Sequence, residues 1–571
     1  MRKRWQIRPY DADLVASLVR DLGVRRTTAR VLVNRRIESV EAARRFLSPS
    51  AADLHDPFLL DDMERAIERI ERAIARGERI MVAGDYDVDG VTSTALYLEL
   101  FGWLGAPLRY RIPHRLTEGY GLTEAGVRAA RDQGVTLVIT ADCGTTAHEP
   151  IALAGSLGID VIVTDHHEPQ DRLPAAYAML NPHRPDSGYP GKELCAVGIA
   201  FKVAQAMLSR RRSLPGMDDR LESVLDLVAL GTIADVAPLR GENRYLVAQG
   251  LRALSAANRI GVAALKDVCG IAGKPVDAGA VGFQLGPRIN AVGRLAEAHA
   301  GVTLLTTRDP DTAASAAREL DAANRERRRI EDEMLTGVMA RIEREIPLDR
   351  ARSIVVADEA WHPGVIGIIA SRVVDRWHLP TVVIALAQDG KGKGSGRSIP
   401  GVHLTRALET CRSCFDGFGG HAAAAGLSIR TERIDEFRER FDAAVASTLS
   451  RDEAYPILSL DDDVELPELT FPLLEELSRL APFGMGNAEP VLASRRLAPR
   501  APRIVGTNHL KFQVRHATAL TFDAIGFGLG DLLPADAAPI DVAFSARVDT
   551  WQGRQRIQLR LKDLRPSTPE D

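Results

Sequence analysis

The chain has 571 residues, of which 45% are hydrophobic and 26% are charged, and its formal net charge is −4. This length predicts three or four domains with sizeable cores, and the composition is typical of a soluble globular protein. The slightly acidic balance excludes a chain that is basic over its whole surface, so any contact with nucleic acid must come from local basic patches.

The cysteine content and the N-terminal sequence indicate the cellular compartment of the protein. The cysteines are Cys143, Cys195, Cys269, Cys411 and Cys414. An odd, sparse set indicates a reducing compartment, and the single C-x-x-C pair lacks the second pair that would favour a zinc site. No apolar segment follows the basic residues 1–4, and no run reaches the length of a membrane span. We therefore expect a cytoplasmic protein that does not bind membranes.

The first part of the chain predicts helices. Residues 1–60 are rich in arginine and carry no recognisable chemistry. Residues 61–76 have apolar side chains at helical spacing, and Gly77 ends the pattern. From there on, strand-like and helix-like segments alternate, which predicts an α/β domain with a parallel sheet.

Three aspartates follow the first predicted strand, residues 80–83, at alternate positions: Asp85, Asp87 and Asp89. Carboxylates crowded at the end of a buried strand repel one another unless a cation holds them, and their hard oxygens suit Mg²⁺ or Mn²⁺. A solvated acidic turn is the plainer alternative. An EF-hand is excluded because its loop needs a glutamate at the twelfth position, where this chain has Leu96.

Two further predicted strands, residues 137–140 and 161–164, also end in metal-binding residue types. Asp142 follows the first of them, and the pair His166 and His167 follows the second. Function collects at the carboxyl ends of parallel strands, so this repeated placement favours a metal site over chance surface residues.

A fourth segment, residues 225–239, is almost wholly apolar around Asp235. Burying a single carboxylate there without a partner would cost several kcal/mol. A metal ion would resolve this cost, and a capping or paired aspartate is the alternative.

These four motifs, taken in order, resemble the DHH phosphoesterase superfamily and, within it, the RecJ family of single-strand-specific 5′→3′ exonucleases. They are Asp85-Tyr-Asp-Val-Asp-Gly, Ala141-Asp-Cys-Gly, Asp165-His-His and Leu230-Gly-Thr-Ile-Ala-Asp235. The resemblance implies two-metal hydrolysis of single-stranded DNA to 5′-mononucleotides, in DNA repair and recombination, with two Mn²⁺ or Mg²⁺ ions.

The resemblance also implies roles for single residues. The implied metal ligands are Asp85, Asp87, Asp89, Asp142, His166 and Asp235. His167, with Asp89 and Asp142, is implied in catalysis, placing a proton or binding the scissile phosphate. Residues 283–295 are similar to a stretch that contacts the DNA backbone in that family, where Arg288 and Asn290 can bind phosphate oxygens.

Residues 311–336 contain neither glycine nor proline and predict a long helix. In the family such a helix connects the catalytic domain to a second domain. That second domain contains a glycine-rich basic loop, residues 390–398, whose spacing differs from a Walker A loop. Together with Phe418-Gly-Gly-His it resembles the DHH-associated domain, which implies that these residues face the substrate: Ser371, Arg372, Ser395, Arg397 and His421.

Short strand-like segments with close turns fill residues 455–571 and suggest a small barrel. The family has an OB-fold here, and OB-folds bind single strands with basic and aromatic side chains. Five side chains could form such a surface: Lys511, Arg515, Arg547, Trp551 and Arg554. We expect the chain to lack the additional C-terminal domain of some family members.

The expected organisation has five parts: an N-terminal helical segment (1–60), a DHH catalytic domain (61–300), a connecting long helix (301–350), a smaller α/β DHH-associated domain (351–450) and a C-terminal OB-fold barrel (455–571). The expected partners are single-stranded DNA, a single-strand-binding protein and a helicase. The alternatives are a DHH phosphodiesterase acting on short oligoribonucleotides or cyclic dinucleotides, and a non-catalytic strand-binding scaffold.

Overall fold

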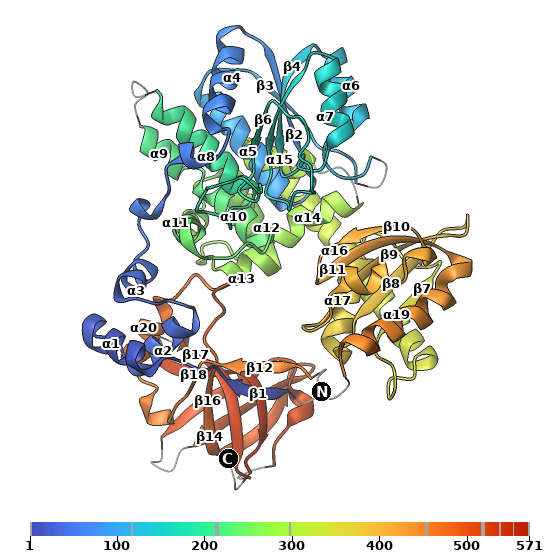
Figure 1. The fold of residues 1–571 in the computed structure, drawn as a ribbon. Coiled ribbons are helices and arrows are strands. Elements are labelled where there is room, and N and C mark those ends of the chain that lie inside the picture. The colour runs from blue at the N-terminus through green and yellow to red at the C-terminus, as the bar shows by residue number, and fades with distance from the viewer. Residues whose placement is uncertain are drawn as a thin grey trace. The chain divides into compact units, whose positions relative to one another are not determined.

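The computed structural model describes residues 3–115, 118–211, 216–295, 299–450, 455–515, 520–535, 538–551 and 553–568. Its contacts divide the chain into two compact units (Figure 1). The larger unit contains Ile7–Asp321 and Ser459–Asp571, and the smaller unit contains Met1–Gln6 and Ala322–Leu458. None of the helices described is both long enough and apolar enough to cross a membrane.

A parallel five-stranded sheet forms the centre of the larger unit, as the alternating pattern predicts. Its strands, in spatial order, are β3 (Leu108–Arg111), β2 (Arg79–Gly84), β4 (Val135–Ala141), β5 (Asp160–Thr164) and β6 (Ala178–Leu180). The three strands expected from sequence are confirmed as β2, β4 and β5. All strands run the same way, so their carboxyl ends meet at one edge of the sheet.

Helices cover both faces of this sheet. α6 (Glu124–Asp132) and α7 (His148–Ser156) pack on one face through a shared apolar cluster. The other face contacts α4 (Met63–Ala75), α5 (Val88–Trp103) and α8 (Ala196–Ser209). Further helices of this unit are α10 (Leu225–Ala234), α11 (Gly241–Ala256), α12 (Ile260–Val268), α14 (Gly286–Leu295) and α15 (His299–Thr306). α10 is apolar on every side because it packs against α5, α8 and α11.

The C-terminal strands form a closed barrel. The strands are β13 (Asp462–Asp463), β14 (Leu492–Val505), β15 (His509–Arg515), β16 (Thr521–Gly526), β18 (Arg554–Pro566) and β17 (Ile540–Trp551), and the closing pair is β14 with β17. The sequence did not predict β14, because prolines and arginines interrupt its pattern. The register shift between Arg500 and Arg503 accommodates Pro502, as bulges do.

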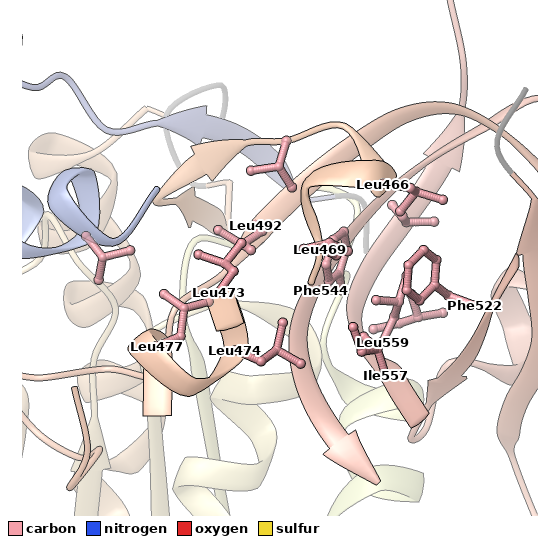
Figure 2. Packing of buried hydrophobic residues seen from close by; sticks show 14 of the residues in the cluster. Leu466, Leu469, Leu473, Leu474, Leu477, Leu492, Phe522, Phe544, Ile557 and Leu559 are labelled. Carbon is pink, nitrogen blue, oxygen red and sulfur yellow. The ribbon is translucent and has the colours of Figure 1, made fainter. Parts of the chain in front are cut away.

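The N-terminal helices do not form a core of their own. α1 (Ala12–Leu22), α2 (Arg26–Asn34) and α3 (Val40–Leu47) bury their apolar side chains in the same cluster as the barrel and α20 (Phe471–Ser478). Figure 2 shows the barrel side of this cluster, where leucines of α20 meet Phe544 and Ile557. A buried ion pair, with Arg35 Nη1 2.7 Å from Asp461 Oδ1, joins the two segments. The helical content expected for residues 1–60 is thus confirmed.

The smaller unit contains a mixed sheet between two layers of helices. Its strands, in spatial order, are β10 (Phe415–Gly420), β11 (Ala424–Arg430), β9 (Lys391–Arg397), β8 (Thr381–Leu386) and β7 (Ile354–Asp358). α17 (Ile366–Trp377) packs on one face, and α18 (Leu404–Glu409) and α19 (Ile434–Thr448) pack on the other. α16 (Pro310–Glu345) is the expected long helix, and the boundary between the units falls within it.

The glycine-rich basic stretch is a strand and not the loop that its composition predicts. β9 pairs with β8 and β11 along its whole length. Gly392, Gly394 and Gly396 face the apolar layer, where a Cβ atom on Gly394 would lie 2.6 Å from Leu427. The alternating lysine, serine and arginine side chains consequently point to the opposite face. Glycine here makes room for neighbouring leucine and isoleucine side chains.

Candidate metal centre

The predicted metal ligands lie where three strands and one helix end. Asp85 follows β2, Asp142 follows β4 and His166 follows β5, while Asp235 ends α10. Asp87 caps α5, since its Oδ1 accepts hydrogen bonds from the backbone N–H groups of residues 89 and 90 at 2.9 and 3.1 Å. The sheet and α10 therefore bring together residues that are up to 150 positions apart in the chain.

Ligand atoms of these residues converge on His166. Its Nε2 lies 3.2 Å from Asp142 Oδ1, 3.6 Å from Asp235 Oδ2 and 3.8 Å from Asp89 Oδ2. Asp85, Asp87 and Asp142 form a second set, whose carboxylate oxygens lie within 4.8 Å of one another. The structure thus places all six predicted ligands in two adjoining groups that share Asp142.

No lysine or arginine forms an ion pair with this cluster among the contacts described. Burial, and after it the charges of neighbouring carboxylates, raises the pKa of Asp89 to about 7 and that of Asp235 to about 8. The same causes raise the pKa values of Asp85 and Asp142 well above their usual range. Burial, and then His167, lowers the pKa of His166 to about 4. The cluster disfavours negative charge and keeps its imidazole neutral, which is the state that binds metal.

Several buried ligand atoms have no hydrogen-bond partner within the described residues. They are Asp85 Oδ1, Asp142 Oδ1 and His166 Nε2. Buried polar atoms are nearly always partnered in native structures, and leaving one unpaired costs about 1–3 kcal/mol. Carboxylate oxygens and a neutral imidazole that converge in this way fit a divalent cation such as Mn²⁺ or Mg²⁺.

His167 lies beside His166, with their ring centroids 4.6 Å apart, and pairs with Asp165, which is itself buried. His167 Nδ1 lies 2.7 Å from Asp165 Oδ1, and this hydrogen bond overcomes burial to raise the pKa of His167 to about 9. The backbone N–H groups of Thr145 and His166 also donate to Asp165, at 2.9 and 2.8 Å. His167 is therefore held as a proton donor beside the cluster.

Three residues without a role expected from the sequence also shape this site. Asp165 orients His167, Asn181 donates to the His167 carbonyl oxygen at 2.9 Å, and the Tyr120 hydroxyl donates to the Asp142 carbonyl oxygen at 2.7 Å. Asp165 could have been found, because an acidic residue directly after an apolar strand needs a partner. Asn181 and Tyr120 lie in segments without a recognisable pattern.

Arg288 and Asn290 lie on α14, behind the aspartate-rich turn. Asn290 Oδ1 accepts the N–H of Val88 at 3.1 Å and so helps to cap α5. Arg288 Nε lies 2.9 Å from Asp321 Oδ1, and its Nη1 donates to the Gln284 carbonyl oxygen at 2.8 Å. These contacts give both residues structural roles, and their binding to phosphate stays a prediction.

The predicted substrate residues of the smaller unit gather at one end of its sheet. Ser395 and Arg397 are neighbours on one face of β9, with Arg397 Nη1 3.1 Å from Ser395 Oγ. The first turn of α17 covers them, since a Cβ atom on Gly367 would lie 2.9 Å from Arg397 Nη2. Ser371 lies one turn further along α17, where its Oγ donates to the Gly367 carbonyl oxygen at 3.2 Å.

The other two predicted residues are more exposed. Arg372 lies on the outer part of α17, with its Nε 3.5 Å from Glu331 Oε1. His421 lies in the turn between β10 and β11, and β11 begins opposite Arg397.

The predicted strand-binding residues of the barrel occupy two places. Lys511 and Arg515 lie on β15, and no ion pair is recorded for either among the described residues. Arg547 on β17 pairs with Glu489 at 2.6 Å, and Arg554 begins β18. Trp551 ends β17, and its side chain lies outside the described residues.

Comparisons with known proteins agree with this architecture. The sequence matches the DHH family, N-terminal domain, over residues 79–232, the DHHA1 domain over residues 351–447 and the RecJ OB domain over residues 460–563. It is 38% identical to the single-stranded-DNA-specific exonuclease RecJ of Bacillus subtilis, over 98% of this chain and 71% of that protein.

Two solved structures are also similar. The crystal structure of RecJ from Thermus thermophilus in complex with Mn²⁺ has a TM-score of 0.85 and 30% identity, covering 99% of this chain and 80% of that one. The same protein in complex with Mg²⁺ has a TM-score of 0.79 and 29% identity, covering 99% and 79%. The ordered motifs, the three matched domains and the similarity over nearly the whole length show that the chain belongs to the RecJ family of single-stranded-DNA-specific exonucleases.

Proposed function

We propose that the chain is a metal-dependent exonuclease that removes 5′-mononucleotides from the 5′ end of single-stranded DNA. One observation carries this proposal: six ligand residues, of which Asp85, Asp89 and Asp142 are buried, converge without a lysine or arginine among the described contacts, in a chain that matches all three domains of the RecJ family. The alternative, cleavage of short oligoribonucleotides or cyclic dinucleotides, is not favoured, because the match to the RecJ OB domain adds a surface for longer strands.

The ligands of two Mn²⁺ or Mg²⁺ ions would be Asp85, Asp87, Asp89, Asp142, His166 and Asp235. When bound, such ions supply an activated water and stabilise the leaving oxygen. Asp142 belongs to both groups of ligand atoms and would be a ligand in the centre they form. His167, protonated and held by Asp165, would donate a hydrogen bond to the scissile phosphate or a proton to the leaving oxygen.

The proposed domain limits are those expected from the sequence: catalysis in 61–300, a connecting helix in 301–350, a substrate domain in 351–450 and strand binding in 455–571. The helices of 1–60 would support the barrel. Arg288 and Asn290 would contact the strand near the metals. A single-strand-binding protein and a helicase would be partners in repair and recombination, and such a substrate places the enzyme in the cytoplasm.

The smaller unit would bind the 5′-terminal phosphate and so determine polarity. Arg397 is half-buried, burial lowers its pKa, and no carboxylate is recorded as its partner within the described residues. It lies beside the first turn of α17, and helix N-termini favour anions. Ser371, Ser395, Arg372 and His421 would add donors. A terminal phosphate carries more charge than an internal diester, so charge-assisted bonds select it.

Digestion of 5′-labelled and 3′-labelled single strands tests the proposed function directly. With Mn²⁺ we expect early release of 5′-labelled mononucleotides, late release of 3′ label and no release in the presence of chelator. Release of the 3′ label first would refute the polarity, and label released in chelator would refute the role of the metal.

Replacing Arg397 by alanine tests how the terminus is recognised. Because hydrogen bonds to charged groups contribute about 1.5–3 kcal/mol, we expect activity on 5′-phosphorylated strands to fall by about 10- to 100-fold, with a much smaller loss on 5′-hydroxyl strands. Lys391→Ala is the matched control, since Lys391 lies on the same face at the other end of β9. Equal losses on both substrates would show that Arg397 does not bind the terminus.

A further inference from the structure

A thiol lies inside the candidate metal centre. Cys195 directly precedes α8 and is fully buried. Its sulfur lies within 4.8 Å of a carboxylate oxygen of Asp89 and of Asp235, in a group whose atoms could hold one ion. Sγ also lies 3.4 Å from the Thr232 hydroxyl. Neither the motifs nor the family resemblance gives this cysteine a role.

An imidazole borders the same two carboxylates. His166 Nε2 lies 3.8 Å from Asp89 Oδ2 and 3.6 Å from Asp235 Oδ2, and it has no hydrogen-bond partner among the described residues. Asp142, which is only 1% exposed, directs a second unpartnered atom, Oδ1, to within 3.2 Å of the same nitrogen. These unsatisfied atoms indicate that the space beside Cys195 is built to receive a cation.

The set of donors suits two kinds of ion differently. Mn²⁺ and Mg²⁺ bind through carboxylate oxygens and imidazole, and for them the protonated thiol is a spectator. Zn²⁺ and chemically similar Cd²⁺ accept sulfur, nitrogen and oxygen together, commonly with four ligands. A sulfur, a nitrogen and two carboxylates would complete that number.

We propose that Cys195, with Asp89, Asp235 and His166, forms a binding site for a thiophilic divalent ion, Zn²⁺ or Cd²⁺, which displaces Mn²⁺ and stops hydrolysis. This inference rests on the proposed metal centre. On binding, the Sγ–H bond breaks, a sulfur–metal bond forms and the proton leaves to solvent. No oxidation or reduction takes place.

Titration of the chelator-treated full chain with Cd²⁺ tests the site, because a cadmium–thiolate bond gives an ultraviolet charge-transfer band. We expect Cys195→Ala and Asp235→Asn each to remove the same component of the wild-type band. Cys195→Ala should also weaken inhibition by Cd²⁺ at least about tenfold. Cys143→Ala is the matched control, since Cys143 is equally buried but its sulfur is directed to the Ala83 carbonyl oxygen at 3.5 Å. A band and an inhibition unchanged by Cys195→Ala would overturn the proposal.

A second measurement uses only the wild-type protein and so does not depend on how the variants fold. When Cd²⁺ is added to the Mn²⁺-loaded chain, the thiolate band should grow as free Mn²⁺ appears in the electron paramagnetic resonance spectrum. A band that grows without Mn²⁺ release would place the thiolate elsewhere, for example at Cys411 and Cys414, and would refute the inference. Failure of the wild type to bind Mn²⁺ would instead refute the proposed function.

Discussion

Helices α5 and α10 each carry a buried or half-buried acidic residue near both of their ends, and the two ends differ in how that charge is compensated. At one end, Asp226 of α10 and Glu99 of α5 share Arg259, whose nitrogens lie 2.7 and 2.8 Å from their carboxylate oxygens. At the other end, Asp235 of α10 and Asp89 of α5 lie near His166 without a lysine or arginine among the described contacts. On α5 about 15 Å separates the two sites, at about 1.5 Å per residue.

The electrostatics of the two ends differ accordingly. Burial disfavours the charge of Arg259, but Asp226 and Glu99 more than offset it and raise the pKa of the guanidinium. At the other end burial and neighbouring carboxylates raise the pKa of Asp235 to about 8. Losing one partner of a buried ion pair is strongly destabilising, so the acids beside Arg259 depend on it, whereas acids shielded from solvent without an internal cation indicate a site that awaits a cation from solution.

Aspartate-to-asparagine substitutions at the two ends of α10 should affect different properties: activity at Asp235 and stability at Asp226. Asp235→Asn should lower hydrolysis at least about a thousandfold, equivalent to about 4 kcal/mol, because it removes a proposed metal ligand. It should not destabilise the metal-free protein. The raised pKa of Asp235 means that its charge costs stability as pH rises from about 4 to about 8, and asparagine avoids that cost.

Asp226→Asn is the control for this comparison. It should lower the stability of the chelator-treated protein by about 2 kcal/mol, because Arg259 loses a charged partner, and leave the metal-dependent activity of the folded enzyme intact. Both variants are assayed for turnover with Mn²⁺ and for the thermal unfolding midpoint with chelator. Comparable destabilisation by the two substitutions would show that the metal end is held by internal partners after all.

Removing the internal cation should have the next largest effect. Arg259→Met leaves Asp226 without a cationic partner and leaves Glu99 with the exposed Arg308 alone, so we expect a loss of about 3–5 kcal/mol in stability. Arg308 also contacts Glu99, at 2.6 Å, but its side chain is 70% exposed. Arg308→Met should therefore cost less than about 1 kcal/mol. Denaturant titration of both variants in the presence of chelator measures these losses of stability. Equal losses for the two variants would contradict this account.

The sequence predicted the cluster near His166, at one end of α5 and α10, better than the ion pairs of Arg259 at the other end. Asp85, Asp142 and His166 each follow a predicted strand, and Asp235 lies in an apolar segment. These positions predicted that the four residues lie together, because parallel strands bring their carboxyl ends to one edge. Nothing in the sequence connected Arg259 to Glu99, since that ion pair depends on how distant helices pack.

Other features depended on tertiary structure in the same way. β9 has the composition of a loop, yet strands on both sides and leucine and isoleucine side chains above it make it a central strand. Residues 1–60 have no core of their own because they share one with a barrel more than 400 positions away. The contact between the Asn290 oxygen and the N–H of Val88 was likewise not predicted from the sequence, because α14 lies about 200 positions from α5.

Binding of Mn²⁺ should depend on pH at the metal end. Asp89 and Asp235, with pKa values of about 7 and about 8 in the metal-free protein, must lose protons when they bind an ion. We expect apparent affinity to rise with pH between about 6 and about 8, by up to about tenfold per pH unit for each proton released. Calorimetry in two buffers of different ionisation enthalpy measures that release. An affinity independent of pH, together with an observed binding enthalpy that is the same in both buffers, would contradict the assignment.

The most direct test of the central claim is the effect of Mn²⁺ on thermal unfolding of the chelator-treated chain. An ion that binds only the folded state stabilises it by about 2.7 kcal/mol at a hundredfold excess over its Kd. We predict a clear rise in the unfolding midpoint for the wild type and for Asp226→Asn, and a much smaller rise for Asp235→Asn. No rise in the wild type, or the same rise in all three proteins, would show that the carboxylate and histidine cluster is not the metal site.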